Sequence, residues 1–209
     1  MRALIIANGD PPSAALFEEI RGDADLVVAA DGGARSALAL GFIPDIVTGD
    51  LDSLGTARNA MPPDSIHLNS DPNSTDLEKA VALCLDEGFD AIDIVGAGGG
   101  RADHALANLS VLVRFGQRAH LRVIDERFAI ELVNGESKID GPIGTVVSLI
   151  SMGHCEGINS SGLRWELQDH SLDFSAYGIH NEIAAPPARI SVRSGNLLLF
   201  QGRWVERHA

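Results

Sequence analysis

Acidic side chains stand in this chain where short apolar runs stop, and residues of this type can bind a metal ion. The sharpest pair is Asp50 and Asp52, which are separated by one residue after an apolar run, and Asp31, Asp76 and Asp103 lie in related motifs. The carboxyl ends of the strands in an open α/β sheet meet in one crevice, so we expect these motifs to gather there. Two carboxylates about 5 Å apart repel by roughly 3 kcal/mol at an effective dielectric near 20. The sequence therefore predicts a Mg²⁺ site suited to phosphate transfer.

Asp50 and Asp52 could reach one ion together because Gly49 frees the backbone at the end of the preceding strand. Mg²⁺ takes one or two carboxylates, several waters and phosphate oxygens. A solvated turn would explain the same residues, but the further acidic motifs favour the metal interpretation. Asp76 begins a helix whose dipole stabilises a carboxylate by itself, so a metal role and a structural role are both open. Asp71 lies just upstream and could supply a further oxygen ligand or a phosphate contact.

A glycine-rich loop at 96–100 leads into a helix-like run near Asp103. Backbone N–H groups of such a loop, with the N-terminus of the helix, can bind phosphate groups. Arg101 adds a forked donor suited to phosphate oxygens. The loop has neither the Walker A ending nor the Rossmann glycine spacing. His104 and Asn108 are four residues apart and share one helix face, where we expect His104 to be a supporting residue and not a base.

Trp165, His180 and Asn181 are the candidate ligand contacts in the last third of the chain. Trp165 could be a core anchor, which is common in a small sandwich, or could offer its face to a heteroaromatic or cationic ring. His180 and Asn181 offer hydrogen bonds at an expected loop tip. Composition alone leaves both interpretations open.

The first 125 residues alternate strand-like and helix-like segments, which predicts a mostly parallel sheet with helices on both faces. The strand candidates are short, rich in β-branched residues and bounded by Gly, Asp or Pro: Ala3–Ala7, Leu26–Ala30, Ile46–Thr48, Ile66–Leu68, Ile92–Val95 and Leu121–Ile124. The helix candidates between them are Ser13–Ile20, Ala34–Leu40, Asp76–Glu87 and Asp103–Phe115. Thr75 and Glu78 form the T-x-x-E pattern of a capping box, which marks the start of the third helix.

The pattern changes near Arg127. From there the chain has short alternating runs, such as Thr145–Ile150, Ile190–Val192 and Leu197–Phe200, which are separated by turn signals. No helical period of useful length appears, so this part predicts an antiparallel β-sandwich or barrel of about 80 residues. We therefore expect two domains, an α/β domain over 1–126 and an all-β sandwich over 127–209.

Composition argues against several classes of function. The net charge is −13, and no basic stripe is present to bind a phosphodiester backbone, so we expect no nucleic-acid partner. No apolar run approaches the length of a membrane span, and nothing resembles a signal peptide. Cys84 and Cys155 are far apart and lack metal-ligand spacing, which indicates reduced thiols in a cytoplasmic protein.

Taken together, the motifs resemble those of the thiamine pyrophosphokinase (thiamine diphosphokinase) family, in the family's order and over nearly the whole chain. They are ADGGA at 30–34, PDIVTGDLDS at 44–53, STDLEKA at 74–80, GGRADHALANL at 99–109, and GLRWEL at 162–167 followed by HNE at 180–182. A single D-x-D would be weak evidence, whereas ordered motifs with compatible spacing are specific.

The resemblance implies an N-terminal domain that binds ATP and Mg²⁺ and a C-terminal domain that helps to bind thiamine. Family members transfer the β,γ-diphosphate of ATP to the thiamine hydroxyl, which gives thiamine diphosphate and AMP. The resemblance also implies a homodimer, with active sites where the α/β domain of one subunit meets the β domain of the other.

By the same resemblance, Asp50, Asp52 and Asp76 are the expected Mg²⁺ ligands. For the transfer itself, we take one of the clustered aspartates, Asp103 or Asp71, as the acceptor of the hydroxyl proton, and the sequence does not decide between them. The residues expected on the nucleotide side are Asp31, Gly32, Gly33, Ser74, Thr75, Gly99, Gly100, Arg101 and His104. The residues expected against thiamine are Trp165, His180 and Asn181.

Two positions depart from the family pattern. Asn73 stands where family members commonly have a second acid, and His180 stands where the thiamine-side motif usually has Ser. Because His is larger and can titrate, a diphosphokinase for another heterocyclic alcohol, such as a hydroxymethylpterin, is an alternative. A metal-dependent phosphoesterase and a nucleotide-sensing module are further alternatives.

Overall fold

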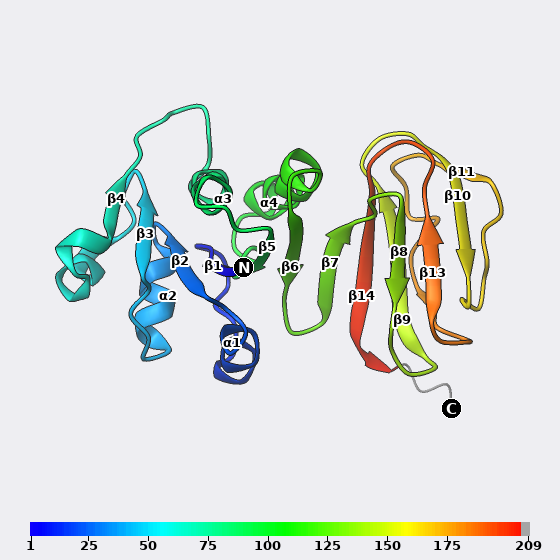
Figure 1. Cartoon of the computed structure of the whole chain (residues 1–209), viewed down its shortest axis with the longest axis horizontal. Coiled ribbons are helices and arrows are strands. Elements are labelled where there is room, and N and C mark those ends of the chain that lie inside the picture. Colours follow the sequence, from blue (N-terminus) through cyan, green and yellow to red (C-terminus); the bar gives the residue numbers. More distant parts are fainter. Residues whose placement is uncertain (206–209) are drawn as a thin grey trace. The chain divides into compact units, whose positions relative to one another are not determined.

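The computed structural model describes residues 1–205, which fold as two compact units that divide between Glu126 and Arg127 (Figure 1). The first unit is an α/β unit, and the second consists of β-strands and loops. This matches the predicted fold class. Within residues 1–205, no helix has both the length and the apolar character that crossing a membrane requires.

The strands of the first unit are parallel and lie in the order β6-β5-β1-β2-β3-β4. They are β1 (Arg2–Ile6), β2 (Leu26–Ala30), β3 (Ile46–Gly49), β4 (Ile66–Leu68), β5 (Ala91–Val95) and β6 (His120–Ile124). Figure 1 shows α1 and α2 on one face of this sheet and α3 and α4 on the other. Strands covered on both faces need apolar residues on both sides, and Leu4, Ile5, Ile92 and Ile94 are accordingly fully buried.

The helices of the first unit are α1 (Ala14–Arg21), α2 (Gly33–Ala39), α3 (Asp76–Asp86) and α4 (Ala102–Phe115). Their ends differ from the predicted ones by one residue at most. The capping box is confirmed, because Thr75 Oγ1 accepts the Glu78 N–H at 3.2 Å and Glu78 Oε2 accepts the Thr75 N–H at 2.9 Å. Cys84 of α3 is fully buried in the core, as predicted.

Two short 3₁₀ helices between β3 and β4, Gly55–Ala60 and Pro63–Ser65, were not predicted. Leu54 and Ala57 are buried there against Val47 of β3. Helices of this kind are too short to show a clear apolar period, so the sequence pattern does not reveal them.

The order of the first sheet reverses at β1, because β2 lies on one side of it and β5 on the other. In a doubly wound sheet, such a switch point opens a crevice at the carboxyl ends of the strands. The segments that follow β1 and β5 are Ala7–Gly9 and the glycine-rich loop at 96–100. The fold thus brings two segments that are far apart in the sequence to one place.

The second unit has two antiparallel sheets, in the orders β12-β9-β14-β7 and β11-β10-β13-β8. Their strands are β7 (Phe128–Leu132), β8 (Glu136–Ile139), β9 (Thr145–Ser151), β10 (Cys155–Ser161), β11 (His170–Leu172), β12 (Asn181–Glu182), β13 (Ala188–Ser191) and β14 (Leu197–Val205). Buried residues of both sheets, including Val147, Ile158, Ile190 and Leu199, form one apolar cluster. The prediction of an all-β sandwich is therefore confirmed.

Candidate active site

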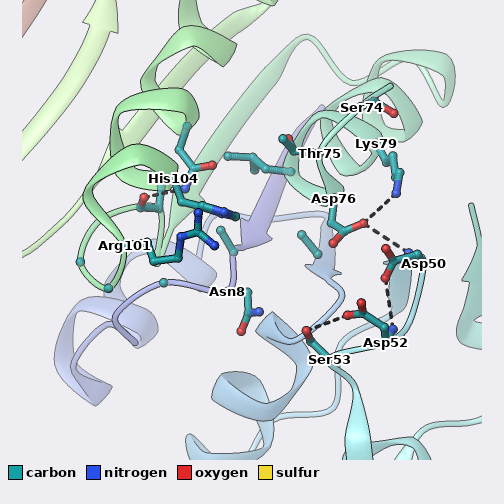
Figure 2. A pocket seen from close by; sticks show the side chains of 18 of the residues that line it. Asn8, Asp50, Asp52, Ser53, Ser74, Thr75, Asp76, Lys79, Arg101 and His104 are labelled. Atoms are coloured by element: carbon teal, nitrogen blue, oxygen red, sulfur yellow. Dashed lines mark hydrogen bonds and ion pairs between the residues drawn. The ribbon is translucent and has the colours of Figure 1, made fainter. Parts of the chain in front are cut away.

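A cavity of about 560 Å³ lies in the first unit, lined by the segments after β1, β3 and β5 and by the first turns of α3 and α4. Figure 2 shows Asp50, Asp52 and Asp76 on one side of this cavity, with Arg101 and His104 across from them. The strand-end motifs of the first unit thus meet in one crevice, as predicted. The cavity has the size of a small-molecule site.

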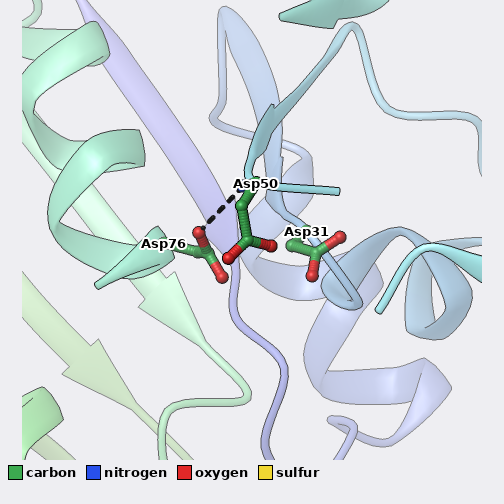
Figure 3. A group of neighbouring side chains, drawn as sticks. All are labelled: Asp31, Asp50 and Asp76. Atoms are coloured by element: carbon green, nitrogen blue, oxygen red, sulfur yellow. Dashed lines mark hydrogen bonds between the residues drawn. The ribbon is translucent and has the colours of Figure 1, made fainter. Parts of the chain in front are cut away.

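The carboxylates of Asp31, Asp50 and Asp76 converge, with one oxygen of each within 4.8 Å of the others (Figure 3). Asp31 follows β2, Asp50 follows β3, and Asp76 is the first residue of α3. The backbone N–H of Asp50 donates to Asp76 Oδ1 at 3.3 Å, which connects the end of β3 with the start of the helix. Three carboxylates at such distances repel one another, and a hard divalent cation would offset that repulsion.

Gly49 permits this convergence. Its φ is +147°, and a Cβ built there would lie 2.9 Å from both Asp31 Cβ and Asp76 Oδ1. The neighbouring Asp31 and Leu51 have φ values of 41° and 66°. Positive φ at residues other than glycine is uncommon and costs energy, and it concentrates at functional sites. The backbone is therefore bent here in a way that brings acidic side chains together.

Asp31 is the most buried member of the cluster, at 1% exposure. Its Oδ2 accepts the N–H of Ser53 at 2.9 Å, whereas no hydrogen-bond partner among the described residues reaches its buried Oδ1. Burial, and then the charges of Asp76 and Asp50, raise the pKa of Asp31 above its ordinary value. A buried carboxylate oxygen without a hydrogen-bond donor, next to two more carboxylates, fits a cation ligand.

Lys79 adds a positive charge beside the cluster. Its Nζ donates to Asp76 Oδ1 at 2.9 Å, and its side chain is 3% exposed. The residue follows Asp76 by one helical turn and also lines the cavity. Because Lys79 and the Asp50 N–H both contact Oδ1, the orientation of the Asp76 carboxylate is fixed and Oδ2 is left for another partner.

Asp52 and Asp71 line the cavity but lie outside the three-carboxylate cluster. Asp52 Oδ1 accepts the Ser53 hydroxyl at 2.9 Å. Asp71 accepts the N–H of Asn73 at 3.0 Å and the hydroxyl of Ser74 at 2.8 Å, and these hydrogen bonds lower the pKa of Asp71. The structure therefore brings Asp50 and Asp76 together as predicted, with Asp31 as their third partner.

The glycine-rich loop forms one wall of the cavity. Gly99 and Gly100 line it in left-handed conformations, with φ values of 76° and 59°. His104 and Asn108 also line it, in agreement with their four-residue spacing on α4. Asn108 Nδ2 donates to the Ala97 carbonyl at 2.7 Å, which ties the helix to the loop.

Arg101 and Asp103 form a forked ion pair at the start of α4. Arg101 donates to both carboxylate oxygens of Asp103, at 3.1 and 2.6 Å, and these hydrogen bonds lower the pKa of Asp103 to about 2. Arg101 lines the cavity, and Asp103 is not among its lining residues. The contact of Asp103 is thus with the arginine and not with the cavity.

Ser74 and Thr75 line the cavity, whereas Gly32 and Gly33 are not among its lining residues. A Cβ on Gly32 would meet the side chain of Asn8, and one on Gly33 would meet the backbone of β1. These glycines allow α2 to approach β1 closely, and they contribute no group to the cavity.

A second cavity, of about 660 Å³, lies in the second unit and brings together Trp165, His180 and Asn181. Trp165 is 55% exposed, which excludes the core-anchor interpretation and leaves its ring accessible to a ligand. Tyr177 also lines this cavity and stacks on His170, with ring centroids 5.2 Å apart. The cavity is therefore rich in aromatic surface, as a site for a ring-bearing ligand would be.

His180 adopts a left-handed conformation with φ of 64°, and its N–H donates to Ser148 Oγ at 3.0 Å. The hydrogen bond helps to hold the residue in this conformation, which is uncommon for residues other than glycine. His180, which stands where the family pattern has Ser, therefore lines the cavity.

Sequence reasoning missed Lys79, Asn8 and Tyr177 as cavity residues, and it gave Asp31 a nucleotide role without a place in the carboxylate cluster. For Lys79 a signal existed, because a Lys one helical turn after an Asp can form an ion pair with it. For Asn8 and Tyr177 we find no comparable signal.

Two family models match the chain. "Thiamin pyrophosphokinase, catalytic domain" matches residues 17–124, and "Thiamin pyrophosphokinase, vitamin B1 binding domain" matches residues 134–197. Thiamin pyrophosphokinase 1 of Caenorhabditis elegans is 29% identical over 210 residues, which cover 92% of this chain and 85% of that protein. Thiamine pyrophosphokinase of Bacillus subtilis is 31% identical over 143 residues, which cover 63% of this chain and 64% of that protein.

Solved structures share the fold. The crystal structure of the Bacillus subtilis thiamine pyrophosphokinase superposes with a TM-score of 0.82 at 24% identity, and covers 97% of this chain and 99% of that one. Thiamin pyrophosphokinase from Candida albicans superposes with a TM-score of 0.80 at 17% identity, and covers 98% of this chain and 89% of that one.

Proposed function

This chain belongs to the thiamin pyrophosphokinase family, and on that premise we propose that it transfers the diphosphate group of ATP to the hydroxyl of thiamine, giving thiamine diphosphate and AMP. The observation that carries the proposal is the convergence of the buried Asp31 with Asp50 and Asp76, the last two of which line a cavity that Arg101 also lines. Carboxylates that gather a cation, opposite a cationic side chain, suit a chain of phosphate groups.

Mg²⁺ is the proposed cofactor. The donor set is made of carboxylate oxygens, which a hard cation prefers, and the buried Asp31 Oδ1 lacks a partner among the residues described. Asp31, Asp50 and Asp76 would hold the ion, and Asp52 is a further candidate ligand. When bound, Mg²⁺ would offset negative charge on the phosphate groups of ATP.

The side chains and backbone of the first unit would position ATP. Arg101 supplies forked N–H donors for phosphate oxygens, and the turn at Gly99 and Gly100 supplies a conformation in which backbone N–H groups can do the same. His104, Ser74 and Thr75 line the same cavity and are proposed nucleotide contacts. Diphosphate transfer would then proceed by attack of the acceptor hydroxyl on the β-phosphorus, in line with the departing AMP.

Asp71 and Asp103 are the two candidates for accepting the hydroxyl proton, and we assign it to Asp71 because only Asp71 lines the cavity. Both carboxylates have a lowered pKa, which makes each a weak base. Phosphoryl transfer depends mainly on positioning and on charge stabilisation, so a weak base is sufficient.

The cavity of the second unit is the proposed thiamine site. Trp165 offers an exposed aromatic face, and His180 and Asn181 lie beside it. A cationic or neutral heteroaromatic ring would gain stacking or cation–π energy there.

Two further proposals concern the state of the protein. The family resemblance favours a homodimer, which analytical ultracentrifugation of the purified protein tests. The free and buried Cys84 and Cys155 favour a reducing compartment, the cytoplasm.

Product analysis tests the proposed function against its rivals. We expect AMP release from ATP to require both thiamine and Mg²⁺. Faster AMP release with a hydroxymethylpterin would favour the other diphosphokinase, inorganic phosphate released without an acceptor would favour a phosphoesterase, and ATP binding with no AMP under any condition would favour a sensing module.

A further inference from the structure

Trp165 is an exposed residue of the loop between β10 and β11, and one side chain holds both of its backbone polar groups. The Trp165 N–H donates to Asn181 Oδ1 at 3.2 Å, and Asn181 Nδ2 donates to the Trp165 carbonyl at 2.7 Å. The Asn181 carboxamide thus makes the pair of backbone hydrogen bonds that a residue of a neighbouring strand would make with Trp165. A loop residue with a large, half-exposed ring is fixed in this way without being buried.

The hydrogen-bonding capacity of Asn181 is nearly used up by these contacts. Its Oδ1 also accepts the N–H of Glu182 at 2.9 Å. A carboxamide has two acceptor positions and two N–H donors, so both acceptor positions and one donor are occupied within the described structure. A single side-chain N–H of Asn181 is left for a ligand, so this side chain mainly binds the backbone of its own chain.

Asn181 is itself fixed to a sheet. It lies on β12 and pairs with Val147 of β9. Two residues along, Ile183 forms a bridge with Leu163, close to Trp165 in the loop. Asn181 and the Leu163–Ile183 bridge therefore connect Trp165 to the sheet and restrict the movement of its backbone.

Arg164 covers one face of the indole. Its guanidinium carbon lies 4.9 Å from the centroid of the Trp165 ring, and its NH1 donates to Glu182 Oε1 at 2.7 Å. The Arg164 N–H also donates to the Glu182 carbonyl, at 3.0 Å. Because one face of the ring already has a cationic neighbour, a ring-bearing ligand would stack on the other face.

We infer that Asn181 is a positioning residue, which acts on the acceptor through Trp165 by clamping its backbone, while Arg164 sets which face of the indole is free. The inference rests on the proposed function only in that the ring-bearing acceptor occupies this cavity. The clamp itself is independent of any ligand.

Fluorescence of Trp165 without ligand tests the clamp. The chain has two tryptophans, so Trp204→Phe leaves Trp165 as the single one. In that background we would compare Asn181→Ala with a matched control, Asn159→Ala. Asn159 Oδ1 accepts the Asp169 N–H at 2.9 Å in the same unit, outside the cavity lining.

We expect Asn181→Ala to increase acrylamide quenching of Trp165 in the unliganded protein about twofold and to raise the KM for thiamine about tenfold, with a smaller change in kcat. Asn159→Ala should leave both unchanged. Asn181→Asp keeps the acceptor oxygens and loses the donor to the Trp165 carbonyl, so it should lie between wild type and Asn181→Ala.

A raised KM in Asn181→Ala with quenching of unliganded Trp165 unchanged would show a direct ligand contact and overturn the inference. Altered quenching with an unchanged KM would overturn it as well, because the position of Trp165 would then not matter to the acceptor. If the wild type forms no AMP with thiamine, the proposed function fails, and the quenching comparison still tests the clamp by itself.

Discussion

Lys79 Nζ lies 2.9 Å from Asp76 Oδ1, one turn along α3, and almost no part of the lysine side chain is exposed. The pair places a fixed positive charge beside three carboxylates that would otherwise repel one another. The cluster can therefore form before a cation binds. The same contact fixes the orientation of a proposed metal ligand, so Lys79 connects the stability of the fold with the chemistry of the cavity.

Lys79→Met should destabilise the protein and weaken its response to magnesium. Removing one partner of a buried ion pair leaves an uncompensated charge, and because Asp76 is partly exposed we expect a loss of about 2 kcal/mol in the free energy of unfolding. Urea denaturation in the presence of a chelator measures this loss. The Mg²⁺ concentration that gives half-maximal activity should rise at least about tenfold, because the Asp76 carboxylate loses the neighbour that orients it.

Lys138→Met is the matched control. Lys138 Nζ pairs with Asp140 Oδ2 at 2.8 Å, but both side chains are exposed. Exposed pairs contribute at most about 1 kcal/mol, so both measurements should stay near those of the wild type. Equal effects of the two substitutions would contradict the role assigned to Lys79.

Asp31→Asn should stabilise the metal-free protein at neutral pH while it removes activity. In the folded protein the pKa of Asp31 is raised above 3.8, the ordinary value that applies to the unfolded chain. At pH values between the unfolded and the folded pKa, the folded protein therefore keeps a proton on Asp31 that the unfolded chain has released. The free energy of unfolding of the wild type therefore falls as pH rises through this window. Asn has no proton to lose, so the free energy of unfolding of Asp31→Asn should exceed that of the wild type at pH values above the folded pKa of Asp31. This difference should vanish at acid pH, where Asp31 is protonated in both states.

Urea denaturation of wild type and Asp31→Asn, at a series of pH values with a chelator present, measures this difference. Activity with Mg²⁺ should fall by about 100-fold or more in the variant, because a proposed ligand is lost. A variant that keeps wild-type activity would remove Asp31 from the proposed metal site. A variant that is less stable than the wild type at neutral pH would contradict the assigned cost of ionising this carboxylate.

Gly49→Ala should disrupt the carboxylate cluster. The added Cβ would lie 2.9 Å from Asp31 Cβ and Asp76 Oδ1, so at least one carboxylate must move. We expect activity to fall by about 100-fold, since small displacements of catalytic groups cost that much. Gly55→Ala is the control for a positive φ without a steric contact, because Gly55 has a φ of +54° and nothing lies within 4 Å of an added Cβ.

Steady-state kinetics compare the activities of Gly49→Ala and Gly55→Ala. Thermal unfolding at a series of Mg²⁺ concentrations compares their responses to the ion. Gly55→Ala should lower stability by about 1 kcal/mol and leave the Mg²⁺-induced rise in Tm intact. Gly49→Ala should lose that rise. A normal magnesium response in Gly49→Ala would show that the cluster does not bind the ion.

Asp103→Asn should act on ATP binding and not on proton transfer. The hydroxyl proton is assigned to Asp71 because Asp103 is not among the residues that line the cavity, and Asp103 instead accepts two hydrogen bonds from Arg101. Asn cannot accept both forked donors as a carboxylate does, so Arg101 loses its fixed position. We expect the KM for ATP to rise about fivefold, with kcat nearly unchanged. A kcat reduced by orders of magnitude, with KM unaltered, would instead make Asp103 the base.

Much of the fold could be predicted because local patterns agree with tertiary structure. The capping box of Thr75 and Glu78 fixed the start of α3 to the residue, and short β-branched runs marked the parallel strands. The same strand ends indicated where Asp50 and Asp76 would meet. The capping box and the strand runs lie within a few residues of the features they predict, and the meeting of Asp50 and Asp76 follows from the common edge at which parallel strands end.

The rest depends on contacts between distant segments. Asp31 joins the cluster only because β2 and β3 are neighbours and Gly49 leaves space between them. The backbone clamp of Asn181 on Trp165 spans 16 residues and depends on a side chain replacing a strand partner. A one-dimensional pattern identifies such residues as polar or aromatic, and it does not show what they contact.

The most direct test of the central claim is ³¹P NMR of the reaction of the purified protein with ATP, thiamine and Mg²⁺. Transfer of the diphosphate group as a unit predicts AMP and thiamine diphosphate in equal amounts, with no product when thiamine or Mg²⁺ is omitted. Formation of ADP with thiamine monophosphate, or of inorganic phosphate without thiamine, would contradict it.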